Sequence, residues 1–218
     1  MTETTITAFN WVPEFVRGYV RDHRVRWALE EIGRPYTTQL MNAMEERPEG
    51  YRQWQPFGQV PAFAEGGLKL FESGAILLYL GEQEESLLPA SGQERWDAIS
   101  WLFAAYASLE PPMARVVGYR KFYADRACAA EALEISMELT RKRFASLAGG
   151  LGDKDWLAGS FSIADIAMVT SLRMVDDTEL FAEYPAIAAY VERGMARPAF
   201  RRAMESHMAD FSETQAPA

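Results

Sequence analysis

Residues 55–76 read QPFGQVPAFAEGGLKLFESGAI, and they carry the clearest structural signals in the first part of the chain. Two short apolar runs, Val60–Phe63 and Leu68–Phe71, are separated by a glycine pair at 66–67. Such a pair favours the tight turn of a β-hairpin. Ser73 follows the second run, where its hydroxyl can cap the N-terminus of a helix. The stretch therefore predicts a β-hairpin followed by a helix.

The sequence before this stretch predicts a strand, a helix and a second strand. Residues 6–9 form a short alternating run typical of a strand. Residues 20–32 place apolar side chains on one helical face and end before Gly33, which suits a helix C-cap. After Pro35, residues 36–40 read as the second strand. The order β-α-β and then β-β-α predicts an α+β fold, with helices packed on a mixed four-stranded sheet.

The chain after residue 81 has a different character. Residues 82–92 are acidic and loop-like, and we interpret them as a linker between a first domain, residues 1–81, and a second domain. The second domain, residues 93–211, carries only helical patterns, and residues 212–218 form a tail. Its helices are expected at residues 95–109 (stopping at Pro111 and Pro112), 127–147, 163–173, 185–197 and from 198 onward.

The composition excludes several classes of protein. The 218 residues carry a formal net charge of −9, whereas nucleic acid is bound by clustered Lys and Arg. No apolar run reaches the roughly 18–20 residues that span a membrane, and the first residues lack a signal pattern. One cysteine, Cys128, and two distant histidines, His23 and His207, form neither a disulfide nor a set of metal ligands. We therefore expect a cytoplasmic protein that binds no nucleic acid, membrane or metal.

Four segments resemble the soluble glutathione transferases, and they occur in the order found in that family. They are residues 24–33, 55–63, 70–76 and 156–166. The last segment contains Ser162 and Asp165, which have the S-x-x-D spacing of an N-capping box. The resemblance covers nearly the whole chain. It implies a thioredoxin-like first domain, an all-α helical-bundle second domain, glutathione as co-substrate and a homodimer.

The resemblance also assigns glutathione-binding residues to two of these segments. Pro61 corresponds to the family's cis-proline, whose bend turns the N–H and C=O of Val60 toward a peptide-like ligand, with Gln59 beside them. Glu72 and Ser73 correspond to the pair that holds the γ-glutamyl end of glutathione. The chemistry is consistent, because a helix N-terminus at Ser73 favours a carboxylate and Glu72 can bind an ammonium group.

The segment before residue 24 departs from the family pattern. Family members place a Ser, Cys or Tyr there beside the glutathione sulfur, but no Ser or Cys lies between residues 6 and 32. A glutaredoxin-like or omega-like cysteine is therefore excluded in the first domain. The candidate catalytic residues are Tyr19, Arg21 and Trp11, because a phenol, a guanidinium or an indole N–H can stabilise a thiolate. Each can equally be a packing or solvated side chain.

A pocket for an apolar electrophile is expected between the domains, over the glutathione site. Its candidate lining residues are Phe15, Trp101, Tyr106, Met113 and Tyr119. Phe57 lies in the loop that can reach a partner subunit in a two-fold dimer, and its alternative role is to shield its own core.

Three functions are compatible with these residues. The first is a glutathione transferase, which stabilises the glutathione thiolate for attack on an apolar electrophile. The second is a specialised glutathione-dependent isomerase, dehalogenase or ether-cleaving enzyme. The third is a non-catalytic binding or regulatory protein with the same fold, because one fold hosts many functions. Glu72 and Ser73 favour glutathione binding, whereas the unusual segment 10–21 leaves the catalytic step open.

Overall fold

The computed structural model describes residues 3–211. The contacts among these residues separate into two compact units, which are described in turn. Unit 1 contains the described residues up to Glu84 and those from Arg197 onward, and unit 2 runs from Glu85 to Ala196. The expected tail, residues 212–218, lies outside the described range.

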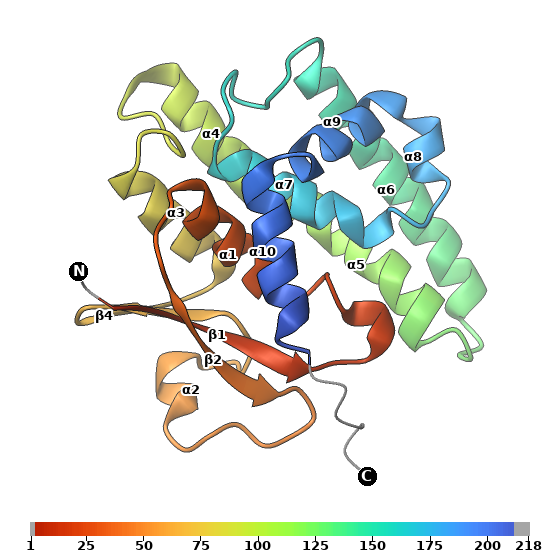
Figure 1. Cartoon of the computed structure of the whole chain (residues 1–218). Coiled ribbons are helices and arrows are strands. Elements are labelled where there is room, and N and C mark those ends of the chain that lie inside the picture. The colour runs from red at the N-terminus through yellow and green to blue at the C-terminus, as the bar shows by residue number, and fades with distance from the viewer. Residues whose placement is uncertain (1–2, 212–218) are drawn as a thin grey trace. The chain divides into compact units, whose positions relative to one another are not determined.

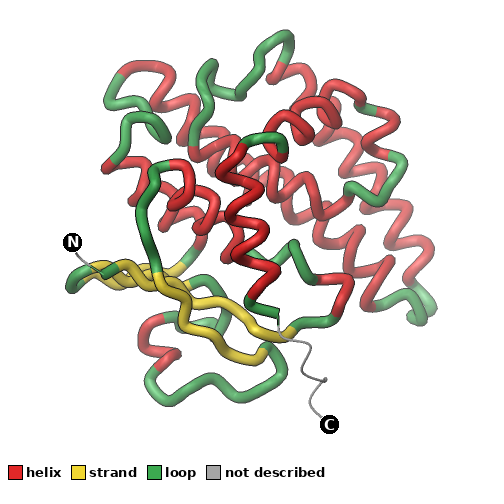
Figure 2. Tube along the Cα trace, in the orientation of Figure 1, coloured by secondary structure: helices red, strands yellow, loops and turns green. Residues whose placement is uncertain are grey.

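Unit 1 is built on the mixed four-stranded sheet that the sequence predicts. Its strands, in the order β2-β1-β3-β4, are β1 (Thr4–Trp11), β2 (Thr37–Asn42), β3 (Ala62–Glu65) and β4 (Leu68–Phe71). β1 is parallel to β2 and antiparallel to β3, and β3 and β4 form the expected hairpin (Figures 1 and 2). The parallel pair needs a crossover connection, which contains helix α1 (Asp22–Glu31).

The side chains of β1 alternate between the two faces of the sheet. Ile6 and Ala8 are buried on one face, and α1 and α3 (Ser73–Gln83) pack against each other above it (Figure 1). Thr7 points to the opposite face, where its hydroxyl contacts the short helix α2 (Tyr51–Trp54). The sequence does not predict α2, because residues 42–56 are polar and are interrupted by Pro48, Gly50 and Pro56.

The last helix, α10 (Pro198–Ala209), packs against α1 within unit 1. Buried charges join the two helices. Arg26 donates to Asp22 on its own helix at 2.8 Å and forms an ion pair with Asp210 at the end of α10. His207 Nδ1 lies 3.0 Å from the Asp22 carboxylate. This buried cluster fixes α10 to the helix that follows the first strand.

The placement of α10 differs from the sequence-based boundary, which assigned residues 93–211 to the helical domain. The residues of this helix group with unit 1, and unit 2 ends at Ala196. An amphipathic pattern shows that one face of a helix is buried, but it does not show which element covers that face.

Unit 2 consists of helices, as expected. They are α4 (Gly92–Ala104), α5 (Glu110–Val117), α6 (Ala129–Leu151), α7 (Ile163–Leu172), α8 (Leu180–Glu183) and α9 (Pro185–Met195). α7 is buried along its whole length and contacts α4, α5 and α9. The predicted capping box at its start is confirmed, because Asp165 accepts the Ser162 N–H at 2.9 Å and the Ser162 hydroxyl accepts the Ala164 N–H at 3.3 Å.

The chain stays helical past Pro111 and Pro112, where the sequence analysis expected a helix to stop. α4 leads through a π-helical turn, Ala105–Leu109, directly into α5, and a second π-helical turn, Gly118–Phe122, follows α5. Both prolines fall in the first turn of α5. A proline cannot donate a helical hydrogen bond, and these two prolines lie where the π-helical turn changes to α-helix and the hydrogen-bond register shifts.

Residues 3–211 contain neither a candidate membrane-spanning helix nor a candidate metal-binding cluster. No helix in that range is both long and apolar enough to cross a lipid bilayer. The same range holds no group of three or more His, Cys, Asp or Glu side chains arranged to bind a metal ion. Cys128 is exposed at the start of α6.

Candidate functional site

The loop between α2 and β3 is held by two side chains from the preceding residues. Arg47 Nε donates to the Gly58 carbonyl at 2.7 Å, and its two Nη atoms donate to three carbonyls of residues 42–45. The Gln55 side-chain oxygen accepts the Gln59 N–H at 3.1 Å. These bonds fix the backbone of the loop immediately before Val60.

Tyr51 holds the same loop from the side of α2. Its hydroxyl donates to the Gln59 carbonyl at 2.6 Å and lies 2.8 Å from the Thr7 hydroxyl of β1. Thr7 Oγ1 in turn accepts the Ala62 N–H at 2.7 Å. Burial raises the pKa of the Tyr51 phenol, although the hydrogen bond with Thr7 and the positive charge of Arg47 act in the other direction. The phenol is therefore neutral at pH 7 and can donate.

Val60 differs from its neighbours in this loop, whose backbone groups are held by side chains. The Val60–Pro61 peptide bond is cis, as predicted. Val60 is only 6% exposed, yet no residue between 3 and 211 forms a hydrogen bond with its backbone N–H or C=O. Buried backbone groups are paired in the great majority of cases. A donor and an acceptor on one residue match the backbone of an extended, peptide-like ligand.

The backbone takes an unusual conformation where β4 joins α3. Glu72 has a φ of 70°, and it is the one non-glycine residue of the described chain with a positive φ. Such a conformation is strained and is maintained by its surroundings. Glu72 occupies the N-cap position and forms no side-chain cap, so the expectation that Ser73 caps this helix is wrong. Ser73 is instead the first residue of α3.

Ser73 is buried beside a cation. Its hydroxyl lies 3.4 Å from Nη1 of Arg24, a buried guanidinium on α1. The N-terminus of α3, the Ser73 hydroxyl and the Arg24 charge together suit a carboxylate. Ala62 pairs with Phe71 in the hairpin, so Val60 and Ser73 both extend from the same end of it. The two predicted ligand-binding segments are therefore neighbours in space.

A cavity of about 260 Å³ is lined by Val60 and other residues of unit 1. The lining residues are Phe9, Val12, Val16, Tyr19, Val20, Arg21, Arg47, Gly58, Gln59 and Val60. Two of the three predicted catalytic residues, Tyr19 and Arg21, thus line the same cavity as Gln59 and Val60. Trp11, the third, is the last residue of β1 and is not among the lining residues.

The cavity has an apolar wall and a polar edge. The apolar wall consists of Phe9, Val12, Val16 and Val20. Tyr19 is 40% exposed, and Arg21 is exposed directly before α1. The Arg47 guanidinium lies over the Phe9 ring, 5.0 Å from its centroid. Such a cavity can hold an apolar group beside an anion that the phenol and the guanidinium groups stabilise.

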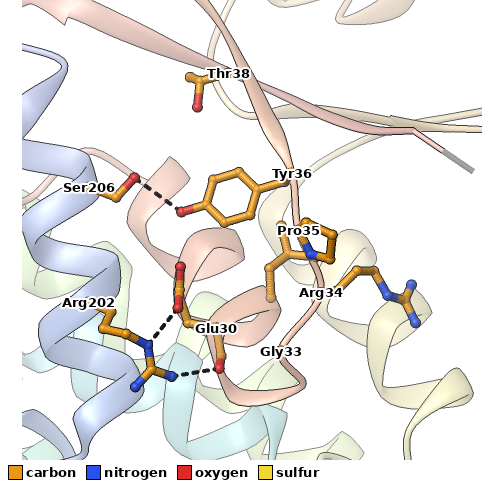
Figure 3. A pocket seen from close by; sticks show the side chains of 9 residues that line it. Glu30, Gly33, Arg34, Pro35, Tyr36, Thr38, Arg202 and Ser206 are labelled. Carbon is orange, nitrogen blue, oxygen red and sulfur yellow. Dashed lines mark hydrogen bonds and ion pairs between the residues drawn. The ribbon is translucent and has the colours of Figure 1, made fainter. Parts of the chain in front are cut away.

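A second hollow in unit 1, of about 480 Å³, lies between the end of α1, the start of β2 and α10 (Figure 3). Its polar groups bind one another. Arg202 donates to the Glu30 carboxylate at 2.8 Å and to the Glu30 carbonyl at 3.0 Å. The Tyr36 hydroxyl donates to Ser206 at 3.2 Å. This hollow is larger than the cavity at Val60, but these groups are already engaged within the protein.

The predicted substrate-side residues are distributed over both units. Phe15 is exposed on a short 3-10 helix, Glu14–Val16, in unit 1. In unit 2, Met113 is fully buried in the core and Trp101 packs against a glycine of α6. Tyr106 and Tyr119 lie in the two π-helical turns. That these five residues bind a substrate stays a prediction.

Sequence reasoning missed Thr7, Tyr51 and Arg47. Each of them acts on a backbone group of residues 58–62, and such contacts leave no recurring spacing in the sequence. Arg47 and Tyr51 also lie in the polar segment 42–56, whose sequence shows no helical or strand period. The aromatic residues Tyr51 and Trp54 in this otherwise polar segment were the signal that could have indicated a structural role.

Comparisons with known proteins agree with this geometry. The model of the glutathione S-transferase N-terminal domain matches residues 7–82, and the model of the C-terminal domain matches residues 102–198. The chain belongs to the glutathione S-transferase family. The sheet and helices of unit 1 are the thioredoxin-like part of this fold, and the second matched segment is helical.

Individual relatives of the chain cover both domains. Glutathione S-transferase-like protein OpS6 of Beauveria bassiana is 30% identical over 82% of this chain and 87% of its own. Disulfide-bond oxidoreductase YfcG of Escherichia coli is 31% identical over 84% of this chain and 89% of its own. A glutathione transferase family member from Pseudomonas fluorescens, solved with two glutathione bound, has a TM-score of 0.81 and 25% identity and covers 93% of this chain and 92% of that one.

Proposed function

We propose that this protein binds glutathione in unit 1 and stabilises its thiolate for attack on an apolar electrophile. The observation that carries the proposal is Val60, which offers a backbone donor and acceptor at a cavity that Tyr19 and Arg21 also line. Gln59 and the cis-proline Pro61 flank Val60. Glu72 and Ser73, at the same end of the hairpin, would hold the α-amino and carboxylate groups of the γ-glutamyl end.

Such a site acts by stabilising the thiolate form of glutathione. A thiol has a pKa of about 8.5 and is mostly protonated at pH 7, and lowering that pKa by about two units supplies roughly 2.7 kcal/mol to the thiolate. A phenol donates a hydrogen bond to the anion, and a guanidinium adds a positive charge. Tyr19 and Arg21 are the residues of the cavity with these groups. The thiolate sulfur then forms a bond to the electrophilic carbon, and the leaving group departs with the electron pair of the broken bond.

The apolar wall supports an apolar second substrate. Phe9, Val12, Val16 and Val20 offer hydrocarbon surface next to the residues that would stabilise sulfur. Because burial of apolar area contributes about 25 cal/mol per Å², this wall favours aromatic or alkyl groups over charged ones. That Phe15, Trp101, Tyr106, Met113 and Tyr119 contact a substrate stays a proposal.

Two measurements on the wild-type protein test the proposal. Calorimetry with glutathione should show binding, and a panel of apolar electrophiles should be consumed faster when protein and glutathione are both present. Binding without turnover would support the non-catalytic binding or regulatory role. Turnover limited to isomerisation, dehalogenation or ether cleavage would identify a specialised enzyme. A folded protein without affinity for glutathione would contradict the whole proposal.

Disulfide reduction is a second candidate, favoured by the relative named a disulfide-bond oxidoreductase and by the related structure that holds two glutathione. Two glutathione molecules can reduce a disulfide to two thiols and become glutathione disulfide, so no protein cysteine is needed. Unit 1 contains no cysteine, in agreement with this chemistry. Formation of glutathione disulfide from a small disulfide substrate, in the absence of an electrophile, would separate this activity from conjugation.

A homodimer in the cytoplasm completes the proposal. Phe57 is 65% exposed, and its ring centroid lies 6.3 Å from that of Phe71. An exposed aromatic pair of this kind suits a two-fold interface between identical patches. Light scattering should give twice the 24.6 kDa chain mass, and Phe57→Ala should shift the equilibrium toward monomer. A monomer mass at all micromolar concentrations would contradict the dimer.

A further inference from the structure

We propose that Tyr51 and Thr7 are positioning residues that aim the backbone of Val60 at the peptide ligand. They act through a hydrogen-bonded chain that runs from Ala62 to Gln59 and encloses the Val60–Pro61 segment. The inference rests on the proposed binding of glutathione at Val60. It adds two residues that touch neither sulfur nor ligand.

The donor and the acceptor of every hydrogen bond in this series are determined. The Ala62 N–H can only donate, so Thr7 Oγ1 accepts from it at 2.7 Å. The Gln59 carbonyl can only accept, so the Tyr51 hydroxyl donates its one proton to it at 2.6 Å. The middle contact, 2.8 Å between the two hydroxyl oxygens, must therefore be a bond from Thr7 to Tyr51. Each hydroxyl donates once and accepts once.

This series of hydrogen bonds fixes the orientation of the Val60 backbone because peptide units are planar. The Gln59 C=O and the Val60 N–H belong to one trans peptide unit and point in opposite directions. When Tyr51 holds the Gln59 oxygen, the Val60 N–H is directed away from α2. On the other side of Pro61, Thr7 holds the Ala62 N–H and with it the next peptide unit. Val60 is thus clamped at both neighbours, while its own two polar groups stay open.

Burial makes the clamp depend on these two side chains. Thr7 is fully buried and Tyr51 is 4% exposed, so water has little access to replace a missing hydroxyl. Arg47 and Gln55 hold residues 58 and 59 by other backbone groups, and neither reaches the Gln59 carbonyl. Loss of the Tyr51 hydroxyl would therefore free this one peptide unit without undoing the whole loop.

Tyr51→Phe is the primary test, because it removes one oxygen and keeps the ring. We expect calorimetry to show about tenfold weaker binding of glutathione. Ophthalmic acid, the tripeptide in which a methyl replaces the thiol, should lose affinity by the same factor, because the clamp acts on the backbone. The thiol pKa of bound glutathione should not change. An effect confined to glutathione, or a shift of that pKa, would place Tyr51 at the sulfur and overturn the inference.

Variants of Thr7 separate positioning from general stability. Thr7→Val, which keeps the shape, should weaken binding as Tyr51→Phe does, and Thr7→Ser, which keeps the hydroxyl, should recover most of the loss. The double variant should be about as weak as either single variant, because both belong to one chain. Additive losses of affinity in the double variant, or no recovery of affinity with Thr7→Ser, would contradict the proposed series of hydrogen bonds. If Tyr51→Phe does not fold, the Thr7 variants test the proposal on their own.

Tyr36→Phe is the matched control. The Tyr36 hydroxyl also donates to a hydroxyl, that of Ser206 at 3.2 Å, but it lines the second hollow of unit 1. Its removal should leave the affinity for glutathione within about twofold, well below the tenfold loss expected at the clamp. An equal loss in both tyrosine variants would show a general effect and overturn the inference. Wild-type protein without glutathione affinity would refute the proposed function itself, whereas binding that Tyr51→Phe leaves intact would refute the positioning role alone.

Discussion

The cavity at Val60 and the hollow at Tyr36 belong to the same unit and differ in what their polar groups do. The hollow is larger, about 480 Å³ against about 260 Å³, and its lining includes three charged residues, Glu30, Arg34 and Arg202, against two, Arg21 and Arg47, at the cavity. Its Glu30 binds Arg202, and its Tyr36 binds Ser206. At the smaller cavity, Val60 keeps a backbone donor and acceptor that no residue between 3 and 211 engages. Unused hydrogen-bonding capacity indicates a site better than volume does.

The difference also assigns different tasks to the two regions. The hollow is bordered by the contacts that attach α10 to α1, with Arg26 donating to Ser206 at 2.8 Å. The cavity is bordered by a loop whose other groups are fixed so that one residue stays available. We therefore expect changes around the hollow to alter stability and changes around the cavity to alter binding.

Arg26→Leu should lower the free energy of unfolding by about 3–5 kcal/mol, because it leaves a buried carboxylate without its cation. Arg26 and Asp22 are both fully buried, and the negative charges of Asp22 and Asp210 raise the pKa of Arg26 against the effect of its desolvation. Arg202→Leu is the control, since its pair with Glu30 is partly exposed to solvent and its loss should cost at most about 1 kcal/mol. Urea unfolding measures both variants. Equally small losses of unfolding free energy in the two variants would contradict a stabilising role for the buried ion pairs of Arg26.

Glu72→Ala combined with Ser73→Ala should weaken glutathione binding at least tenfold, or about 1.4 kcal/mol. The two changes remove the groups proposed for the γ-glutamyl end. The matched double variant in the hollow, Tyr36→Phe with Ser206→Ala, removes two hydroxyls there and should leave the affinity unchanged. Calorimetry compares the two. Unchanged affinity in the Glu72→Ala, Ser73→Ala variant would contradict the assignment of these two residues to glutathione binding.

Glutathione bound at the cavity should titrate below its free value, and Tyr19→Phe or Arg21→Ala should raise that pKa by about one unit, or 1.4 kcal/mol. Both residues line the cavity. The thiolate absorbance of each complex, followed as pH rises, is the measurement. If wild type and variants all show the value of free glutathione, the transferase mechanism fails. A shift that neither variant changes would point to Trp11 or a backbone N–H.

Glu65→Gln should remove an acid-dependent contribution to stability of about 1 kcal/mol. Burial alone would raise the pKa of Glu65, but hydrogen bonds from Thr4 and Tyr79 and the charge of Arg34 lower it overall. A carboxyl pKa that is lower in the folded state stabilises the protein above the unfolded value, and this contribution is lost as pH falls through the folded value.

Arg34 lines the hollow and forms an ion pair with Glu65 at 3.3 Å. The Glu65 variant therefore changes a contact of the hollow and leaves the cavity at Val60 as it is. Urea unfolding at pH 7 and near pH 3 should show a smaller difference for Glu65→Gln than for wild type, while glutathione affinity at pH 7 stays the same. Identical acid dependence in both proteins would show that Glu65 carries no such contribution.

Local patterns predicted most of the sheet and many helix starts. The glycine pair at 66–67 lies in the observed hairpin turn, and the capping box at Ser162 opens α7. Pro185 and Pro198 are the first residues of α9 and α10, as expected. These features depend on residues within a few positions of one another. The helix at residues 110–117 was missed because a proline pair stops one helix and can equally begin another.

Short motifs and hydrophobic periods in the sequence were enough to indicate the family and the α+β fold, and the resemblance to that family named Val60, Glu72 and Ser73 as candidate residues. The folded chain was needed to show that Tyr19 and Arg21 line one cavity with Val60 and that Trp11 is not among its lining residues. It alone placed α10 against α1 and joined Thr7, Tyr51 and Gln59 in one chain of hydrogen bonds. These arrangements depend on contacts between residues far apart in the chain, and no local pattern records which distant partner a buried group will meet.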